Sequence, residues 1–275
     1  MAIANSWFLK LQRAREHIYS FQKDSAAWIA TKPYGIVDER DPDPPLQTLG
    51  IDAQARRYRI DRVTDVPLEL SVIIGDCLFN LRSALDHLAF ALAQKHTGAM
   101  SNNQIVGSGF PIFGRKPDAK DWAKKVGCMA PGASSIIEKL QPYHRGNDFA
   151  QDALWKIHRL NIIDKHRALT LCGAEPLRGS GRGFGIHADG FTNWKETLQY
   201  SQTLGRFSFE KNAIWMRWAP HAIDPSQEVR VEADLPVEIV FDKSGPAPLE
   251  PVLISLHALC DYVDDPVIAL LTPFL

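Results

Sequence analysis

The sequence predicts an α+β fold, in which a helical bundle is joined to a small antiparallel sheet. Two long segments, residues 6–30 and 69–95, repeat their apolar side chains at the three-and-four spacing of an α-helix. After residue 178 the chain is rich in glycine and then alternates apolar and polar residues, as antiparallel strands do. The composition, 45% hydrophobic and 23% charged, is that of a folded globular protein.

The N-terminal half is predicted to be mainly helical. Asn5 or Ser6 can cap a first helix that runs to about residue 30. Prolines then predict an exposed loop at residues 41–45, and residues 57–63 alternate like a short strand at a sheet edge. The longest helical signal, residues 69–95, is apolar on most of its circumference. A helix of this kind belongs in the middle of a bundle.

The second half is predicted to add shorter helices, strands and a returning helix. The expected helices are residues 119–126, 133–140, 148–171 and 253–262, and the expected strands are residues 208–218 and 228–241. Gly173 is expected to cap the C-terminus of the third helix of that set.

These elements predict three parts. A helical bundle domain spans residues 1–175, with a strand-and-loop insertion near residues 33–66. A small β-rich subdomain covers residues 176–250. The C-terminal helix, within residues 251–275, packs back on the bundle.

The composition and the termini argue against several function classes. With 31 Lys and Arg against 32 Asp and Glu, the net charge of −1 gives no overall attraction to nucleic acid or to anionic membranes. The first residues lack the pattern of a signal peptide, and no apolar run reaches the roughly 18 residues of a transmembrane helix. The four cysteines are far apart, which predicts buried thiols in a reducing compartment and no zinc site. We therefore expect a cytoplasmic protein without membrane contact.

Polar residues interrupt the apolar surface of both central helices. Asp76, Asn80, Ser83 and His87 are spaced four, three and four residues apart, which places them on one stripe of the first helix.

On the second helix, Asn161 and Asp164 interrupt an apolar stripe, and His166 lies on a neighbouring one. A buried polar group without a partner costs about 1 to 3 kcal/mol. We therefore expect the two helices to be neighbours whose polar residues form one connected network.

Three interpretations of this network stay open. The first is a structural network that fixes the helix register, with Arg82 and Asp86 as an i,i+4 ion pair. The second is a set of titratable groups that includes a histidine tuned near neutral pH. The third is a metal site between the helices, built from Asp76, His87, Asp164 and His166. No Glu-x-x-His pair supports the third, so we predict neither a metal nor another cofactor.

Two segments carry a resemblance to known proteins. Residues 75–87, Gly-Asp-Cys-Leu-Phe-Asn-Leu-Arg-Ser-Ala-Leu-Asp-His, and residues 161–167, Asn-Ile-Ile-Asp-Lys-His-Arg, resemble a group of uncharacterised bacterial proteins that contain both. The resemblance covers roughly the first 175 residues. Within it, the R-x4-H spacing from Arg82 to His87 is similar to the motif of HEPN ribonucleases, which are small helical bundles.

The HEPN resemblance implies an RNA-cleaving site that needs no metal and forms across a homodimer. In this sequence it implies that Arg82 stabilises charge on the scissile phosphate and that His87 acts as a general acid or base toward the ribose 2′-OH. Ser83, Asn80 and Asp164 would orient these two catalytic groups. The further binding residues expected in the same two segments are Asp76, Asn161, His166 and Arg167.

The sequence departs from the family pattern in two respects. Ser83 stands where the family usually has Asn, Asp or His after the arginine. Arg82 and His87 also project about 140° apart on an ideal helix, so dimerisation is needed to bring an arginine and a histidine to one phosphate.

Two function classes follow from the sequence. One is a HEPN-like, metal-independent endoribonuclease. The other is a non-enzymatic interaction or small-ligand-binding module with a structural polar network. The burial of Arg82 and His87 distinguishes the two classes. RNA cleavage is excluded if both side chains are sealed inside a monomer, and it is favoured if they line a cleft at a two-fold interface.

Overall fold

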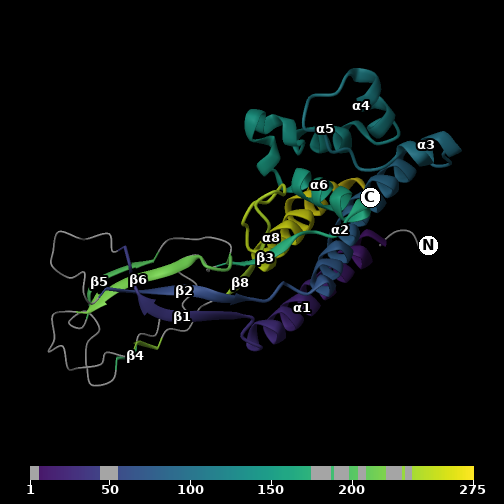
Figure 1. Ribbon diagram of the computed structural model, residues 1–275. Helices are drawn as coiled ribbons and strands as arrows, with labels where there is room; N and C mark the ends of the chain where they lie inside the picture. Colours follow the sequence, from purple (N-terminus) through teal and green to yellow (C-terminus); the bar gives the residue numbers. More distant parts are fainter. Residues whose placement is uncertain are drawn as a thin grey trace. The chain divides into compact units, whose positions relative to one another are not determined.

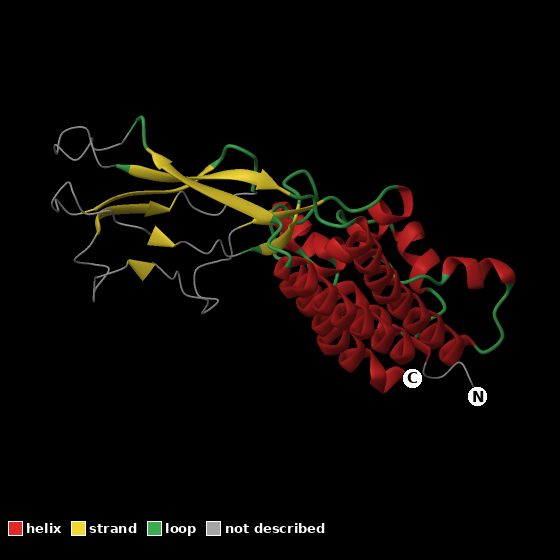
Figure 2. Cartoon of the chain, turned by 60° about the horizontal axis from the view of Figure 1, so that its bottom comes forward, coloured by secondary structure: helices red, strands yellow, loops and turns green. Residues whose placement is uncertain are grey.

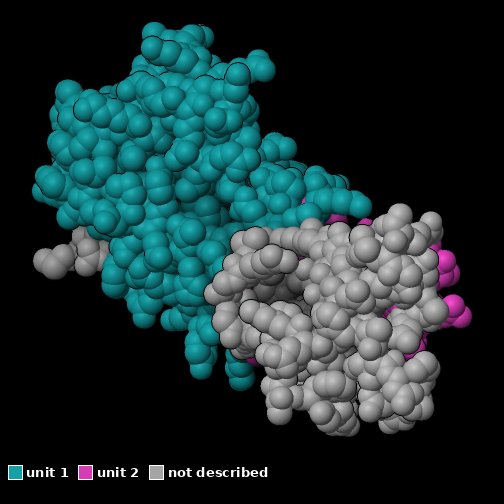
Figure 3. Space-filling view, turned by 90° about the vertical axis from the view of Figure 1, so that its left-hand side faces the viewer, with its two compact units in different colours: residues 1–25, 67–170, 243–275 teal, residues 26–66, 171–242 magenta. Residues whose placement is uncertain are grey.

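We describe a computed structural model of the chain. It describes residues 6–43, 55–174, 187–188, 198–203, 209–220, 231–232 and 237–275. The chain divides into two compact units (Figure 3). The helical unit comprises residues 1–25, 67–170 and 243–275, and the sheet unit comprises residues 26–66 and 171–242.

The predicted α+β fold is confirmed, since the chain combines helices with antiparallel sheets. Figure 1 labels the elements. The helical elements are α1 (Ser6–Ala30), α2 (Leu68–Thr97), α3 (Asn102–Gly107), α4 (Ala119–Val126), α5 (Pro131–Lys139), the 3-10 segment η2 (Pro142–Gln151), α6 (Ala153–His166), α8 (Val252–Tyr262), η3 (Val263–Ile268), α9 (Ala269–Leu271) and η4 (Thr272–Phe274).

The long helices of the helical unit lie side by side (Figure 2). One face of α1 buries Trp7, Leu11, Ala14, Ile18 and Phe21, which return at helical spacing. The predicted C-terminal helix is α8, which packs against α6. Lys156 of α6 and Glu250, just before α8, add an ion pair of 2.5 Å to this contact.

The helix α2 packs against α6 and supplies much of the core. The mostly apolar circumference of α2 predicts a helix that is enclosed on all sides. The structure differs from this prediction on one stripe. Leu68, Val72 and Phe79 are exposed, and their spacing of four and seven residues places them on one stripe. The sequence signal for burial is correct for most of the circumference and wrong for this stripe.

The sheet unit contains a four-stranded antiparallel sheet in the order β1-β2-β6-β5. Its strands are β1 (Tyr34–Arg40), β2 (Arg56–Val63), β5 (Leu198–Thr203) and β6 (Ile214–Pro220). Two further pairs join β3 (Leu171–Ala174) to β8 (Glu238–Phe241) and β4 (His187–Ala188) to β7 (Val231–Glu232). The strand predicted at residues 57–63 is therefore interior, because β6 from a distant part of the sequence pairs with its second edge.

This pairing also divides the chain differently from the predicted parts. Residues 33–66 are predicted as an insertion in the helical domain, but β1 and β2 share a sheet with β6 and β5. The segment therefore belongs to the same unit as residues 171–242. Residues 243–250, predicted as part of the β-rich subdomain, belong to the helical unit.

The helix predicted at residues 148–171 is shorter than expected. The Asp152 side chain accepts the N–H of Leu154 at 2.9 Å and caps the N-terminus of α6 there. Arg167 adopts an extended conformation and ends the helix. Gly173 is consequently not a C-cap; it lies in β3 opposite Ile239, where a Cβ atom would overlap the Tyr34 ring.

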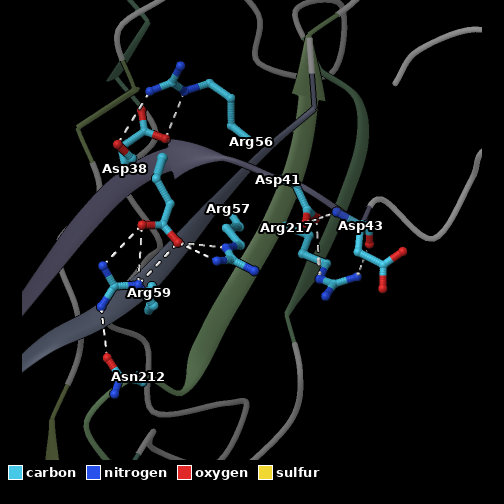
Figure 4. Close-up of polar contacts among 9 residues, drawn as sticks. Asp38, Asp41, Asp43, Arg56, Arg57, Arg59, Asn212 and Arg217 are labelled. Carbon is cyan, nitrogen blue, oxygen red and sulfur yellow. Dashed lines mark hydrogen bonds and ion pairs between the residues drawn. The ribbon is translucent and has the colours of Figure 1, made fainter. Parts of the chain in front are cut away.

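One face of the sheet carries a network of ion pairs (Figure 4). Glu39 of β1 binds both Arg57 and Arg59 of β2, with N–O distances of 2.6 and 3.0 Å. The two guanidinium groups lower the pKa of the Glu39 carboxyl, chiefly through their hydrogen bonds. On β6, Arg217 lies 3.4 Å from the buried carboxylate of Asp41. The arginines of this cluster are thus already paired with carboxylates of the same unit.

The structure also bears on two further predictions, which concern membrane-spanning helices and the cysteines. None of the described helices is both long and apolar enough to cross a bilayer. None of the four cysteines forms a disulfide; Cys77 and Cys260 are buried, and Cys128 and Cys172 are half-buried. Burial raises the pKa of the Cys260 thiol to about 11.

Candidate functional site

The residue predicted as the catalytic cation, Arg82, is bound within the fold. The predicted ion pair with Asp86 is confirmed: Arg82 Nη2 donates to Asp86 Oδ1 at 2.7 Å, and Arg82 Nε donates to Asp86 Oδ2 at 3.2 Å. The same Nη2 also donates to the carbonyl oxygen of Phe110 at 2.8 Å. Asp86 Oδ1 in turn accepts the N–H of Phe110 at 2.9 Å.

These contacts hold both backbone hydrogen-bonding groups of one residue, Phe110. Arg82 holds the carbonyl of Phe110 and Asp86 holds its N–H, while the Phe110 side chain is 1% exposed and lies in the core. We call this set, Arg82, Asp86 and the backbone of Phe110, the loop clamp. It fixes the segment between α3 and α4 to the middle of α2. Hydrogen bonds to charged groups typically contribute about 1.5 to 3 kcal/mol each, more than neutral ones.

A second polar side chain, that of Gln141, bonds the same segment between α3 and α4. Gln141 is buried, its Oε1 accepts the N–H of Phe113 at 3.0 Å, and its Nε2 donates to Pro111 O at 2.9 Å. The segment following α3 is therefore bonded to the bundle at two places through its backbone. The side chains of Arg82 and Gln141 serve one purpose, which is to satisfy buried backbone groups of a loop.

The predicted catalytic base, His87, lies beside the clamp in a different environment. It is half-buried and lines an open pocket of about 560 Å³. Its Nδ1 atom is buried and has no hydrogen-bond partner among the residues that the structure describes. Arg82 is not among the residues that line this pocket. Arg82 and His87 thus face different surroundings, as their angular separation on one helix predicts.

The other polar residues of the α2 stripe make local contacts. The Nδ2 of Asn80 donates to the carbonyl of Asp76 on its own helix at 2.8 Å, and Lys10 of α1 donates to Asn80 Oδ1 at 3.3 Å. Ser83 is half-buried and Asp76 is exposed. The buried Asn80 therefore joins α2 to α1. The sequence predicts that Asn80 bonds the polar residues of α6, but its hydrogen bonds go to Asp76 and Lys10.

One part of the predicted meeting between α2 and α6 does occur. Asp164 lies against Gly75, where a Cβ atom would overlap its carboxylate, so glycine is needed for this close approach. Burial and, second, the negative charge of Asp76 raise the pKa of the Asp164 carboxyl. On the α1 side, burial lowers the pKa of His17, and Asp76 partly opposes that shift.

The remaining predicted residues do not join a common network. Asn161 is buried, but its Oδ1 has no partner among the described residues. His166 and Arg167 are exposed at the C-terminal end of α6. Within the described ranges, the hydrogen bonds therefore do not connect the two polar seams into the single network that the sequence predicts. Asn161 breaks its apolar stripe without a contact that explains it.

Sequence reasoning missed one residue near the clamp, His158 of α6. Its ring is half-buried and lies 5.9 Å from the Trp155 ring, measured between centroids. Burial lowers the pKa of His158, and the positive charge of Arg82 lowers it further. His158 lies between the two stripes considered on α6, and only its packing against α2 reveals its position.

No metal site is formed among the residues that the structure describes. They contain no group of three or more His, Cys, Asp or Glu side chains arranged to hold an ion. In particular, Asp76 and His166 are exposed and His87 lines a separate pocket. The geometry around α2 and α6 therefore offers structural hydrogen bonds, a raised carboxyl pKa and one open pocket.

The first prediction concerns the loop clamp. Asp86→Ala should lower the free energy of unfolding by about 1 to 3 kcal/mol, because it leaves a backbone N–H and a guanidinium group without their partner. Glu16→Ala, which removes the exposed Arg13–Glu16 pair of α1, is the matched control and should change stability by less than about 0.5 kcal/mol. Urea unfolding measures both. Equal effects of the two substitutions would show that the clamp does not hold the loop.

The second prediction concerns the pH dependence of Asp164. Because its pKa is raised in the folded state, the folded state binds this proton more readily than the unfolded state. The ionised carboxyl therefore opposes folding at neutral pH, and this effect disappears as the pH falls through the raised pKa toward the ordinary value of about 4. Relative to wild type, Asp164→Asn should gain stability at pH 7 and lose that gain near pH 4. A stability difference that does not vary with pH contradicts the assignment.

Comparison of the chain with protein-family models, with curated proteins and with solved structures finds no match. Its function is therefore argued from the geometry of the chain itself.

Proposed function

We propose that this protein is a non-enzymatic module that binds a small ligand or a partner, and that the polar residues of α2 are mainly structural. The observation that carries the proposal is the loop clamp. Arg82 has a side chain that is 17% exposed, and it bonds both Asp86 and the Phe110 carbonyl. A cation with these partners already has the function of satisfying buried groups.

Using Arg82 for RNA cleavage would require the clamp to open. To contact a phosphate, the guanidinium group would leave the Phe110 carbonyl and the Asp86 carboxylate, and both acceptors would lose a charge-assisted bond. Preorganised cations in active sites are instead held so that they face the reacting group without rearrangement. This cost supports the binding module over the ribonuclease.

A second candidate function is the HEPN-like, metal-independent endoribonuclease. It is favoured by three features of His87: the residue borders an open pocket, its Nδ1 has no hydrogen-bond partner among the described residues, and it follows Arg82 at the R-x4-H spacing. The Nη1 of Arg82 is also buried, with no hydrogen-bond partner in the described ranges. This candidate requires a homodimer in which RNA reaches a histidine and an arginine together.

Incubation with a mixed pool of labelled RNAs in EDTA distinguishes the two candidates. The binding module predicts that wild type leaves the RNAs intact. His96→Ala, an exposed histidine near the end of α2, is the matched control for His87→Ala. Cleavage that leaves 2′,3′-cyclic phosphate ends and vanishes in His87→Ala, but not in His96→Ala, would establish the ribonuclease and overturn the proposal.

A further inference from the structure

Three large apolar side chains of α2 lie in water on one line of the helix. Leu68, Val72 and Phe79 are 62%, 56% and 47% exposed, and their spacing of four and seven residues places them on one face. Scattered exposed apolar side chains are common, but those that gather on one face and are rimmed by polar groups are typical of a docking surface. We call these three residues the apolar stripe.

Two carboxylates flank the apolar stripe at its middle. Asp76 is exposed and lies between Val72 and Phe79 along α2. The Asp164 carboxylate of α6 lies against Gly75, where a Cβ atom would overlap it. At about 100° per residue, the line through Val72 and Phe79 passes between positions 75 and 76. One carboxylate therefore lies on each side of the stripe.

The middle of the stripe is negatively charged. Burial and the charge of Asp76 raise the pKa of the Asp164 carboxyl, and no cation or hydrogen bond among the described residues opposes that shift. Burial lowers the pKa of the nearby His17, so its ring is neutral at pH 7. Lys10 lies 5.4 Å from the centre of the Phe79 ring, which places its charge at one end of the stripe.

This charge distinguishes between the possible occupants of the stripe. A second copy of the chain, paired about a two-fold axis, would bring Asp76 and Asp164 close to the same carboxylates of the other copy. Like charges placed together across an interface disfavour binding. A wholly apolar surface would take both carboxylates out of water without a partner. An amphipathic helix with one basic residue on its apolar face complements the stripe and both carboxylates.

We propose that the apolar stripe docks an amphipathic helix of a partner protein, with an arginine of that helix between Asp76 and Asp164. Apolar side chains of the partner cover Leu68 and Val72 on one side of the arginine and Phe79 on the other. Arginine suits this position because its planar fork of donors can bond two carboxylates at once. The proposal rests on the proposed function as a binding module and names the kind of partner.

Fluorescence anisotropy of a labelled synthetic helix, titrated with the full chain, tests the proposal. The probe is an alanine-based peptide of about 20 residues, which is long enough to form a helix in water. It carries leucines at the four-and-seven spacing of the stripe and one arginine within the seven-residue gap. A matched peptide has glutamate in place of that arginine. The arginine peptide should bind about ten-fold more tightly, and high salt should reduce the difference.

Two variants make the test specific to this surface. Phe79→Ala removes exposed apolar area and should weaken binding of the arginine peptide about ten-fold. Asp76→Arg reverses one of the two charges and should abolish the preference for the arginine peptide over the glutamate peptide. The matched controls, Ile254→Ala and Asp261→Arg, change an exposed apolar residue and an exposed carboxylate of α8, and both should bind as wild type does.

Several results would overturn the proposal. They are the absence of peptide binding at millimolar concentration, equal binding of the two peptides, and a preference that Asp76→Arg leaves unchanged. A dimer in sedimentation equilibrium that Phe79→Ala dissociates would show that a second copy covers the stripe. A urea-unfolding midpoint that Phe79→Ala lowers would show that the chain covers the stripe itself.

Failure of the proposed function has a different signature, which is cleavage of RNA in EDTA by the same preparation. A protein that neither cleaves RNA nor binds the arginine peptide would contradict the partner assignment alone.

Discussion

The loop clamp is the interaction on which the arrangement of the helical unit around α2 depends. One ion pair on α2 satisfies both the backbone N–H and the backbone carbonyl of Phe110. Phe110 then enters the core, and the residues after α3 follow a fixed path. Ser108 and Gly109, which lie on this path, line the pocket beside His87. Without the clamp, a buried peptide group would be left unsatisfied, which native proteins rarely tolerate.

The loop clamp explains why Arg82, the first residue of a motif with the spacing of a catalytic pair, has a structural role. A guanidinium group is well suited to a carboxylate and a carbonyl at once, because its donors project in a fixed fork. Asp86 lies four residues after Arg82, so the ion pair forms on one turn and presents a donor and an acceptor to the neighbouring chain. His87, the next residue, takes no part in the clamp and borders the pocket together with Asp86.

The sequence predicted the elements whose signals are local. The helix α1 was expected from residue 5 or 6 to about 30 and spans Ser6–Ala30, and α2 was expected at residues 69–95 and spans Leu68–Thr97. Both have a long apolar period that needs no knowledge of partners. The Arg82–Asp86 pair was also predictable, because an i,i+4 spacing fixes the neighbours on a helix.

What depends on distant contacts was not predictable. The second neighbour of β2 and the shortened α6 are set by β6, by the Asp152 cap and by the extended Arg167. The clamp itself escapes sequence analysis because its third member is a backbone group, which every residue carries. His158 was missed because its position beside Arg82 follows from the packing of α6 on α2.

The central claim is that Arg82 holds the fold and does not contact a ligand. Nuclear magnetic resonance of the Arg82 Nε–H group measures this directly. We expect a signal that is protected from exchange with water in the free protein and that keeps its chemical shift when single-stranded RNA is added. An Arg82 signal that exchanges rapidly, or that shifts on addition of RNA, would show a guanidinium group that is available for phosphate.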